Sequence, residues 1–344
     1  MQKALLLQPD ESLHQLKPVN SELRFSLVIP IYNEEESIVA LIDAVSTALQ
    51  DEAEPWELLL VDDGSSDTSI RVAQQKLAIT PINARLIQLS RNYGQTAAMQ
   101  AGIDEARGQY IVTMDGDLQN DPRDIPAMLQ QLIEQDLDLL VGWRQNRQDG
   151  LILRKIPSLL ANRLIGRVSG LRLHDYGCSL KVYRAEIIKQ IRLVGEMHRF
   201  IPLWVAGIVP PSRIGEMPVR HHARQYGQSK YGISRTIRVI LDLLSVMFFK
   251  RYVMRPGHLF GTIGLILGFI GSLMLMYLAV DKYVLGNDIG TRPMLQVGVM
   301  SVLMSLQFLM TGILAELISR TYLGSSSNNK NYLIRHVYQR QGDV

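Results

Sequence analysis

The chain has 344 residues, a formal net charge of +3 and a single cysteine, Cys178. The small net charge argues against nucleic acid as the main partner, and we recognise no DNA- or RNA-binding module in the sequence. One cysteine excludes a disulfide framework and a cysteine metal cluster. The length suits one large domain with additional segments, and the charged residues are unevenly distributed along it.

Residues 1–24 are expected to form a flexible extension, and residues 25–235 a domain in which strands and helices alternate. Such alternation predicts right-handed βαβ units and a mostly parallel sheet, whose ligands bind at the carboxyl ends of the strands. The predicted strands are Phe25–Ile29, Glu57–Val61, Ala84–Leu89, Tyr110–Met114 and Leu137–Val141. The predicted helices are Glu35–Gln50, Thr68–Leu77, Thr96–Ala106 and Ile125–Glu134.

Two of the predicted strands end in acidic clusters, Asp62-Asp63-Gly64 and Asp115-Gly116-Asp117. Carboxylates on alternate residues can reach one divalent cation, and Gly116 removes a side chain that would crowd the ligand. Hard oxygen ligands suit Mg²⁺ or Mn²⁺, which in turn suit a diphosphate. Ordinary turn chemistry is the alternative, because Asp and Gly are common in turns. Since both clusters follow strands of one sheet, we expect them to face one crevice.

Two uncharged segments, Leu259–Val280 and Met294–Ala315, are each about as long as a bilayer-crossing helix. We therefore predict a transmembrane hairpin over 256–322, with spans at about 257–280 and 294–317, followed by a cytoplasmic tail at 323–344. Two buried core helices are the alternative. Basic residues flank the hairpin on the side of both termini, which the positive-inside rule places in the cytoplasm. They are Lys250, Arg251, Arg255, Arg320, Lys330 and Arg335.

Residues 236–255 have apolar side chains at helical spacing together with Arg238, Asp242, Lys250 and Arg251. This pattern predicts an amphipathic helix at the membrane interface. An ordinary helix facing the protein core fits the same pattern.

Four motifs in chain order carry a resemblance to a known family. They are Val28 to Glu35, Val61 to Asp67, Asp115 to Gln119 with Asp121-Pro122, and Arg220 to Tyr231. With them the chain resembles the family 2 glycosyltransferases of GT-A fold. It is most similar to the polyisoprenyl-phosphate glycosyltransferases, which include dolichol-phosphate mannose synthases and bacterial GtrB-type enzymes. The resemblance implies an α/β, Rossmann-like GT-A domain in the cytoplasm, with the interface helix and the hairpin attached to it.

The resemblance also implies roles for individual residues. Pro30, Tyr32 and Glu34 would line the nucleotide pocket, and Asp62 would hold the base or the ribose. Asp115, Asp117 and Gln119 would surround the metal and the diphosphate. Arg144, Ser229 and Lys230 would grip the phosphate of the acceptor, with Asp175 near the acceptor.

The chemistry of a phosphate acceptor bears on these roles. A phosphate monoester is mostly ionised near neutral pH, so a strong general base is less necessary than for a hydroxyl acceptor. Cationic positioning matters more, and Arg144, Arg220, Arg224 and Lys230 can supply it. We therefore expect Asp175 to orient its neighbours before acting as a base, and we take Asp117, Asp175, Arg144 and Lys230 as the catalytic residues.

Several of these residues have plainer interpretations. Asp63 can cap a helix, Gln119 can be a solvated loop residue, and Arg144 can be a surface charge. The basic segment 220–231 can meet anionic lipid headgroups, which is compatible with a role in acceptor binding.

The predicted function is inverting transfer of a hexose to undecaprenyl phosphate at the cytoplasmic face of the inner membrane, with Mg²⁺ or Mn²⁺. The resemblance suggests UDP-glucose as donor and a homotetramer as assembly. GDP-mannose or a UDP-amino sugar is the alternative donor. A non-catalytic membrane scaffold is the rival from a different class of protein.

Overall fold

The computed structural model describes residues 22–145, 171, 173–193, 195, 197–222, 256–324 and 334–339. The chain divides into two compact units. The first comprises residues 1–240 and 330–344, and the second comprises residues 241–329. Each unit is described by itself.

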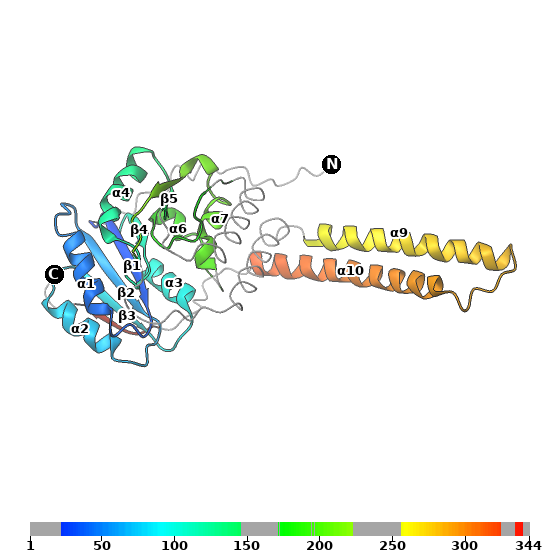
Figure 1. Cartoon of the computed structure of the whole chain (residues 1–344), viewed down its shortest axis with the longest axis horizontal. Helices are drawn as coiled ribbons and strands as arrows, with labels where there is room; N and C mark the ends of the chain where they lie inside the picture. The colour runs from blue at the N-terminus through cyan, green and yellow to red at the C-terminus, as the bar shows by residue number, and fades with distance from the viewer. Residues whose placement is uncertain are drawn as a thin grey trace. The chain divides into compact units, whose positions relative to one another are not determined.

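The first unit is built on an eight-stranded sheet with the order β7-β5-β6-β4-β1-β2-β3-β8. Figure 1 shows its central strands β4, β1, β2 and β3 next to one another. Strands β1 to β4 are parallel to their neighbours among themselves, as predicted, and β5 is parallel to β7. Strand β6 runs antiparallel to both β4 and β5, and β8 runs antiparallel to β3. The strands are β1 Phe25–Ile31, β2 Trp56–Asp62, β3 Ala84–Leu89, β4 Tyr110–Thr113, β5 Leu139–Trp143, β6 Lys181–Arg184, β7 Ile214–Pro218 and β8 Ile334–Gln339.

Helices cover both faces of this sheet. One face contributes Leu27, Leu58 and other alternate residues to a core shared with α1, α2 and α4. Helix α3 packs on β1 and β2, and a Cβ on its Gly102 would lie 2.3 Å from Val28, which keeps this helix close to the sheet. The helices are α1 Ile38–Ala48, α2 Ser69–Ile79, α3 Gln95–Glu105, α4 Ile125–Glu134, α6 Ala185–Ile188 and α7 Ile201–Val205, with short 3-10 turns η2 Pro122–Asp124, η3 Met197–Phe200 and η4 Pro211–Arg213.

Strand β1 continues past the point where Pro30 was expected to end it. Its pairing with β4 stops at Val28, which lies opposite Thr113, whereas its pairing with β2 continues to Ile31. A proline lacks the N–H that a ladder requires and is tolerated where no partner strand needs it. Since β4 has already ended, Pro30 breaks no ladder hydrogen bond, and β1 reaches the carboxyl edge of the sheet.

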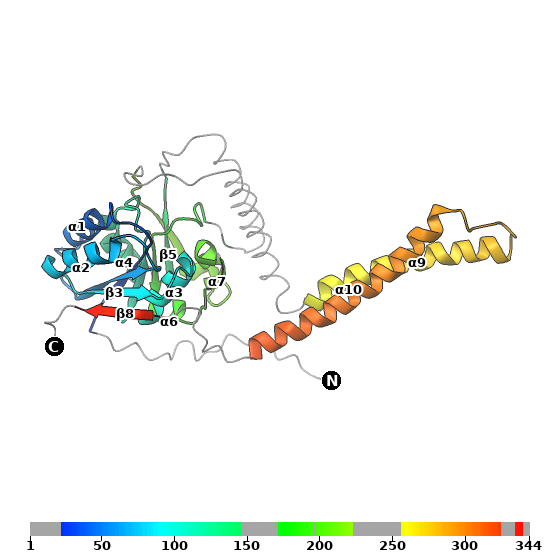
Figure 2. The same cartoon turned by 90° about the horizontal axis from the view of Figure 1, so that it is seen from below.

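The tail of the chain returns to the first unit. Strand β8 pairs with β3 along the edge of the sheet, with Val337 opposite Ile87 and Gln339 opposite Arg85 (Figure 2). The sequence alone predicts only a tail over these residues. The pairing covers a strand edge that would otherwise leave unpaired backbone groups exposed.

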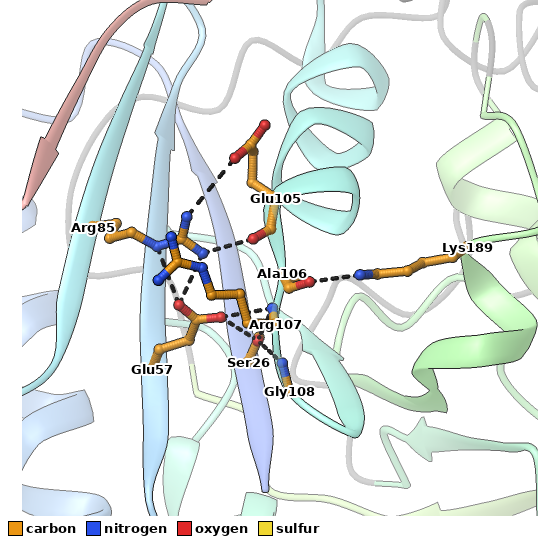
Figure 3. A network of polar contacts seen from close by, with 8 residues as sticks. All are labelled: Ser26, Glu57, Arg85, Glu105, Ala106, Arg107, Gly108 and Lys189. Atoms are coloured by element: carbon orange, nitrogen blue, oxygen red, sulfur yellow. Dashed lines mark hydrogen bonds and ion pairs between the residues drawn. The ribbon is translucent and has the colours of Figure 1, made fainter. Parts of the chain in front are cut away.

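A buried ion pair lies near the amino-terminal ends of the central strands (Figure 3). Glu57 accepts hydrogen bonds from Nε and Nη2 of Arg85 at 3.1 and 2.9 Å, and both side chains are almost fully buried. Its other oxygen accepts from the hydroxyl of Ser26 at 2.6 Å and from the backbone N–H of Arg107 at 2.8 Å. Arg85 also donates to the carbonyl of Glu105. The network therefore ties the end of α3 to strands β1, β2 and β3.

The second unit is a hairpin of two long helices, α9 Pro256–Tyr283 and α10 Pro293–Gly324. Both are long and apolar enough to span a membrane. Added Cβ atoms on Gly264, Gly268 and Gly271 would lie 2.6 to 3.0 Å from atoms of α10. The small residues therefore allow the two helices to pack closely.

The ends of the two helices are joined by polar contacts. Asp281 pairs with Arg292 and accepts a hydrogen bond from the side-chain amide of Asn287 at 2.8 Å. Opposite charges at the turn of the hairpin therefore neutralise each other.

Candidate functional site

The acidic residues that follow β2 and β4 lie at the same edge of the sheet. Asp62 is the last residue of β2, opposite Ile31 of β1, and Asp115 follows β4 on the other side of β1. Because these strands are parallel, their carboxyl ends meet at one edge, where open α/β sheets bind ligands. The structure therefore brings together the two acidic clusters that the sequence placed at strand ends.

Asp62 has one carboxylate oxygen that is satisfied and one that is not. Oδ2 accepts from the backbone N–H groups of Gly64 and Ser65, each at 3.1 Å. Oδ1 is buried and makes no hydrogen bond with the residues that the structure describes. Burial raises the pKa of this carboxyl, and the hydrogen bonds from Ser65 and Gly64 oppose the rise. A buried acceptor without a donor is costly, so this oxygen is suited to a ligand that brings an N–H or O–H group.

Asp63 joins two loops at this edge. Its two oxygens accept from the backbone N–H groups of Tyr93 and Gly94 at 2.8 and 2.9 Å. The sequence analysis considered a helix cap for Asp63 and did not predict this contact. The approach of the loops also requires Gly64, which has a φ of +70° and whose added Cβ would lie 2.3 Å from the backbone of Arg91.

The other residues expected around a nucleotide lie at the end of β1. Pro30 is within β1, and Tyr32 follows the strand with 42% of its surface exposed. The carboxylate of Glu34 accepts a hydrogen bond from the hydroxyl of Ser37, directly before α1. Its backbone N–H donates to Ser69 at 2.8 Å, which links the starts of α1 and α2.

Asp115 and Asp117 form a pair of carboxylates at the end of β4. Asp115 Oδ1 accepts from the side-chain amide of Gln95 at 2.7 Å, and Asp117 Oδ1 accepts from the backbone N–H of Gln119 at 3.2 Å. Burial raises the pKa of Asp115, and repulsion from Asp117 raises it further. Gly116 lies between them, and a side chain at this position would point towards β1. An added Cβ would lie 3.2 Å from Ile31 and 3.3 Å from the Pro30 carbonyl. A side chain at Gly116 would therefore be in tight contact with strand β1 of the protein itself.

These two carboxylates fit a divalent cation. The two carboxylates repel each other in a partly buried place, so a bound cation would stabilise their ionised forms. Among the described residues, no three His, Cys, Asp or Glu side chains are grouped to hold a metal by themselves. This matches the preference of Mg²⁺ for one or two carboxylates, with the remaining positions taken by water and substrate phosphates.

Arg144 and Asp175, expected near the acceptor, form a tight pair. Arg144 Nε lies 2.7 Å from Asp175 Oδ2, and Nη2 lies 3.0 Å from Oδ1. The two side chains are 14% and 9% exposed, so Arg144 is not a surface charge. Burial opposes the charged form of Arg144, but the contact with Asp175 outweighs it and holds the guanidinium pKa well above its usual range.

Lys181 on β6 is a buried cation beside this pair that the sequence analysis missed. Its ammonium donates to the carbonyl of Cys178 and interacts electrostatically with Asp115 and Asp175. Burial lowers the pKa of Lys181, while these neighbours act to raise it. The sequence carries no clear signal for it, because burial does not alternate along β6 and a lysine within a four-residue strand suggests a solvent-facing position.

Arg220 lies at the end of β7 and contacts carboxylates. Its Nε is 3.0 Å from Asp124 and its Nη1 is 3.8 Å from Asp121, while 55% of the side chain stays exposed. A pocket of about 400 Å³ lies beside it, lined by Asp124, Gln145 and residues 218–222. The remaining residues expected to hold the acceptor phosphate, Arg224, Ser229 and Lys230, lie outside the described residues, as does the interface helix predicted at 236–255.

The first unit shares its fold with solved structures. Solved structures of glucosyl-3-phosphoglycerate synthase from Mycobacterium tuberculosis are similar to this chain. The structure of its complex with Mn²⁺, UDP-glucose and phosphoglyceric acid has a TM-score of 0.52 and 17% sequence identity. The similarity covers 70% of this chain and 85% of that chain. The first unit is therefore the mostly parallel GT-A fold that the resemblance implied.

Sequence comparisons then define the family. The model of glycosyl transferase family 2 matches residues 26–192. The chain is 61% identical over 95% of its length to dodecaprenyl-phosphate galacturonate synthase of Rhizobium johnstonii, covering 96% of that protein. It is 34% identical over 92% of its length to undecaprenyl-phosphate 4-deoxy-4-formamido-L-arabinose transferase of Salmonella choleraesuis, covering 94% of that protein. The chain belongs to the family 2 glycosyltransferases, in the polyisoprenyl-phosphate group.

Proposed function

We propose that this chain transfers galacturonate from a UDP-linked donor to a polyprenyl phosphate, with inversion at the sugar carbon. The observation that carries the choice of sugar is the 61% identity, over nearly the whole of both chains, to a protein named for that product. The comparisons do not confirm the glucose that the sequence analysis expected. A formamido-arabinose donor is the second candidate, because the relative named for that sugar is 34% identical over most of the chain.

On the donor side, the proposal assigns the base or ribose to Asp62, whose free oxygen Oδ1 accepts a hydrogen bond from it. Asp115 and Asp117 would hold Mg²⁺ or Mn²⁺ together with the diphosphate, and Gln119 lies next to them in the chain. The cation supplies Lewis-acid stabilisation of the charge that develops on the departing nucleotide diphosphate. Gln95 orients Asp115 through the hydrogen bond of 2.7 Å.

On the acceptor side, the proposal gives Arg144 the task of holding the phosphate. A guanidinium has five N–H donors, and Asp175 occupies one on Nε and one on Nη2, so three remain for an anion. Asp175 fixes the plane of the guanidinium in this arrangement. A carboxylate engaged in this way is a weak base, which suits an acceptor that is already ionised. Arg224, Ser229 and Lys230 remain candidates for the same phosphate.

The proposed location is the inner membrane. The two apolar helices α9 and α10 would form the anchor, and the basic residues beside them support a cytoplasmic location for both termini and the first unit by the positive-inside rule. This orientation gives the site access to cytoplasmic nucleotide sugars and to the headgroup of a lipid phosphate. We propose a homotetramer as the assembly, on the family resemblance alone.

The test is transfer of radiolabelled sugar to undecaprenyl phosphate by the full-length protein in detergent. The donors would be UDP-galacturonate, UDP-glucose, the UDP-linked formamido sugar and GDP-mannose, each with Mg²⁺, with Mn²⁺ and with EDTA. We expect metal-dependent label in the lipid from UDP-galacturonate. Label from another donor alone would overturn the choice of sugar, and full activity in EDTA would overturn the metal. A folded protein that transfers no sugar to this lipid or to shorter polyprenyl phosphates would favour the scaffold.

A further inference from the structure

The segment that follows β7 is fastened to the loop that follows the Asp115–Asp117 pair. The backbone N–H of His222 donates to the carbonyl of Gln119 at 2.8 Å, and His221 forms an antiparallel bridge with Asn120. The backbone N–H of Arg220 donates to Asp124 at 2.7 Å. Three consecutive residues at the end of β7 therefore hold the loop over residues 119–124.

Side chains reinforce the same contact. Arg220 Nε lies 3.0 Å from Oδ1 of Asp124, so this carboxylate receives both the backbone and the side chain of one residue. His222 Nε2 lies 3.1 Å from Asp121 Oδ2. Asp124 has only 7% of its side chain exposed, whereas Asp121 has a second cationic partner in Arg123. Among the described residues, Asp124 forms its ion pair with Arg220.

The loop leads directly to the proposed metal site. Asn120 Nδ2 donates to Ser179 Oγ at 2.7 Å, and Ser179 in turn hydrogen-bonds the carboxylate of Asp115. On the other side, the backbone of Gln119 holds Asp117 through the contact at 3.2 Å. A displacement of residues 119–124 would therefore reach both carboxylates that face the cation. Residues in such outer contacts commonly fix the geometry of metal ligands.

We propose that Arg220 is a positioning residue for the metal–diphosphate site, acting through Asp124, and does not bind the acceptor phosphate as the sequence analysis expected. The inference rests on the proposed function, because it requires a cation at Asp115 and Asp117. Arg220 is the ion-pair partner of a nearly buried carboxylate. Removing its side chain leaves Asp124 with the backbone N–H of residue 220 and the electrostatic attraction of Arg123, and so loosens the hold on the loop.

Two variants separate the positioning role from phosphate binding. Arg220→Met removes the cation, and Asp124→Asn removes its partner while leaving Arg220 in place. If Arg220 acts through Asp124, both variants weaken the metal site in the same way. If Arg220 binds the acceptor phosphate, Asp124→Asn leaves that function intact. The carboxylate of Asp124 repels an anion, so its removal takes away no phosphate ligand. Arg213→Met is the matched control, since Arg213 precedes the same strand β7 at its other end and also pairs with two carboxylates, Asp136 and Asp138.

The experiment measures Mn²⁺ binding to the full-length protein in detergent with UDP present, by the electron paramagnetic resonance signal of free Mn²⁺. The KM for undecaprenyl phosphate is measured in parallel. We expect Arg220→Met and Asp124→Asn each to weaken Mn²⁺ binding by about 10-fold or more. The double variant should be no weaker than either single variant, and Arg213→Met should bind as the wild type does. Arg220→Lys keeps a cation near Asp124 and should recover part of the Mn²⁺ affinity. Such recovery would show that the loss in Arg220→Met does not come from a failure to fold.

The outcomes are distinct. A raised acceptor KM in Arg220→Met, with Mn²⁺ affinity unchanged and Asp124→Asn normal, would overturn the inference and return Arg220 to the acceptor phosphate. Unchanged Mn²⁺ binding in every variant would overturn it as well. A wild-type protein that binds no Mn²⁺ in the presence of UDP would overturn the proposed metal together with the inference.

Discussion

Arg144 and Asp175 meet as a bidentate ion pair, with Nε 2.7 Å from Oδ2 and Nη2 3.0 Å from Oδ1. Asp175 is itself held by the backbone N–H of Gly177 at 3.2 Å. The guanidinium is therefore fixed in plane and direction at the end of β5. A lysine ammonium is a point charge that cannot reproduce this geometry.

We therefore predict that Arg144→Lys lowers kcat/KM for the lipid acceptor by about 10- to 100-fold, the range expected for loss of one charge-assisted hydrogen bond. Steady-state kinetics with undecaprenyl phosphate would measure the loss. Asp175→Asn should lower activity at every pH without changing the shape of the pH profile, because Asp175 orients Arg144. Abolition of activity by Asp175→Asn, rescued by raising the pH, would instead identify Asp175 as a base. Arg213→Lys serves as the control.

The buried oxygen of Asp62 predicts how a nucleotide changes stability with pH. Burial raises the pKa of this carboxyl above 3.8, so the folded protein binds the proton more tightly than the unfolded chain does. The resulting stability is fully present below the ordinary pKa, and it is lost as the pH rises through the raised pKa. A ligand that donates to Oδ1 stabilises the ionised form. UDP should therefore raise Tm more above the raised pKa of Asp62 than below it.

The check is thermal unfolding of the full-length protein with and without UDP at pH values below and above the raised pKa of Asp62. Asp62→Asn should remove the pH dependence of the UDP-induced shift. Asp43→Asn, which alters an exposed carboxylate on α1, should leave it in place. A UDP-induced shift that is the same at every pH in the wild type would show that the nucleotide does not reach Asp62.

The pair Glu57–Arg85 supports the end of the sheet opposite the site (Figure 3). Removing one partner of a buried ion pair costs about 3–5 kcal/mol, because the remaining charge is left without compensation. We predict that Arg85→Met lowers Tm by on the order of 10 °C for a domain of this size. Lys76→Met breaks the partly exposed pair with Asp43 and should change stability by about 1 kcal/mol or less. Similar Tm values for the two variants would contradict the prediction.

The sequence predicted the central fold because the strands there are short apolar runs bounded by turn residues. Ala84–Leu89 and Ile125–Glu134 have in the structure the bounds that periodicity predicted. Strands β7 and β8 were not predicted. The sequence of β7 contains Gly215 and Glu216, and β8 alternates poorly and lies far along the chain from its partner β3. Pairing between distant strands depends on tertiary contacts that local patterns do not encode.

The acidic strand ends were predictable because Asp115 and Asp117 lie at a spacing that serves one cation. Their supporting contacts were not. Gln95 and Ser179 reach Asp115 from separate segments of the chain, and Asp63 binds backbone groups of a distant loop. Such contacts leave no pattern in the sequence, since any hydrogen-bonding residue at those positions reads as a polar loop residue.

Strand β8 covers the edge of β3 along Arg85 to Leu89 in an antiparallel pairing. Among the described residues, no segment between β3 and the hairpin pairs with this edge. Deleting residues 334–344 would expose that edge and remove hydrogen bonds worth roughly 0.5–1.5 kcal/mol each. We expect a lower Tm, faster hydrogen exchange at the β3 amides that face β8, and association of the variant through the open edge. Deleting only residues 340–344, which lie beyond β8, should leave these properties unchanged. Equal stability and exchange in the two deletion variants would show that β8 does not hold the edge of the sheet.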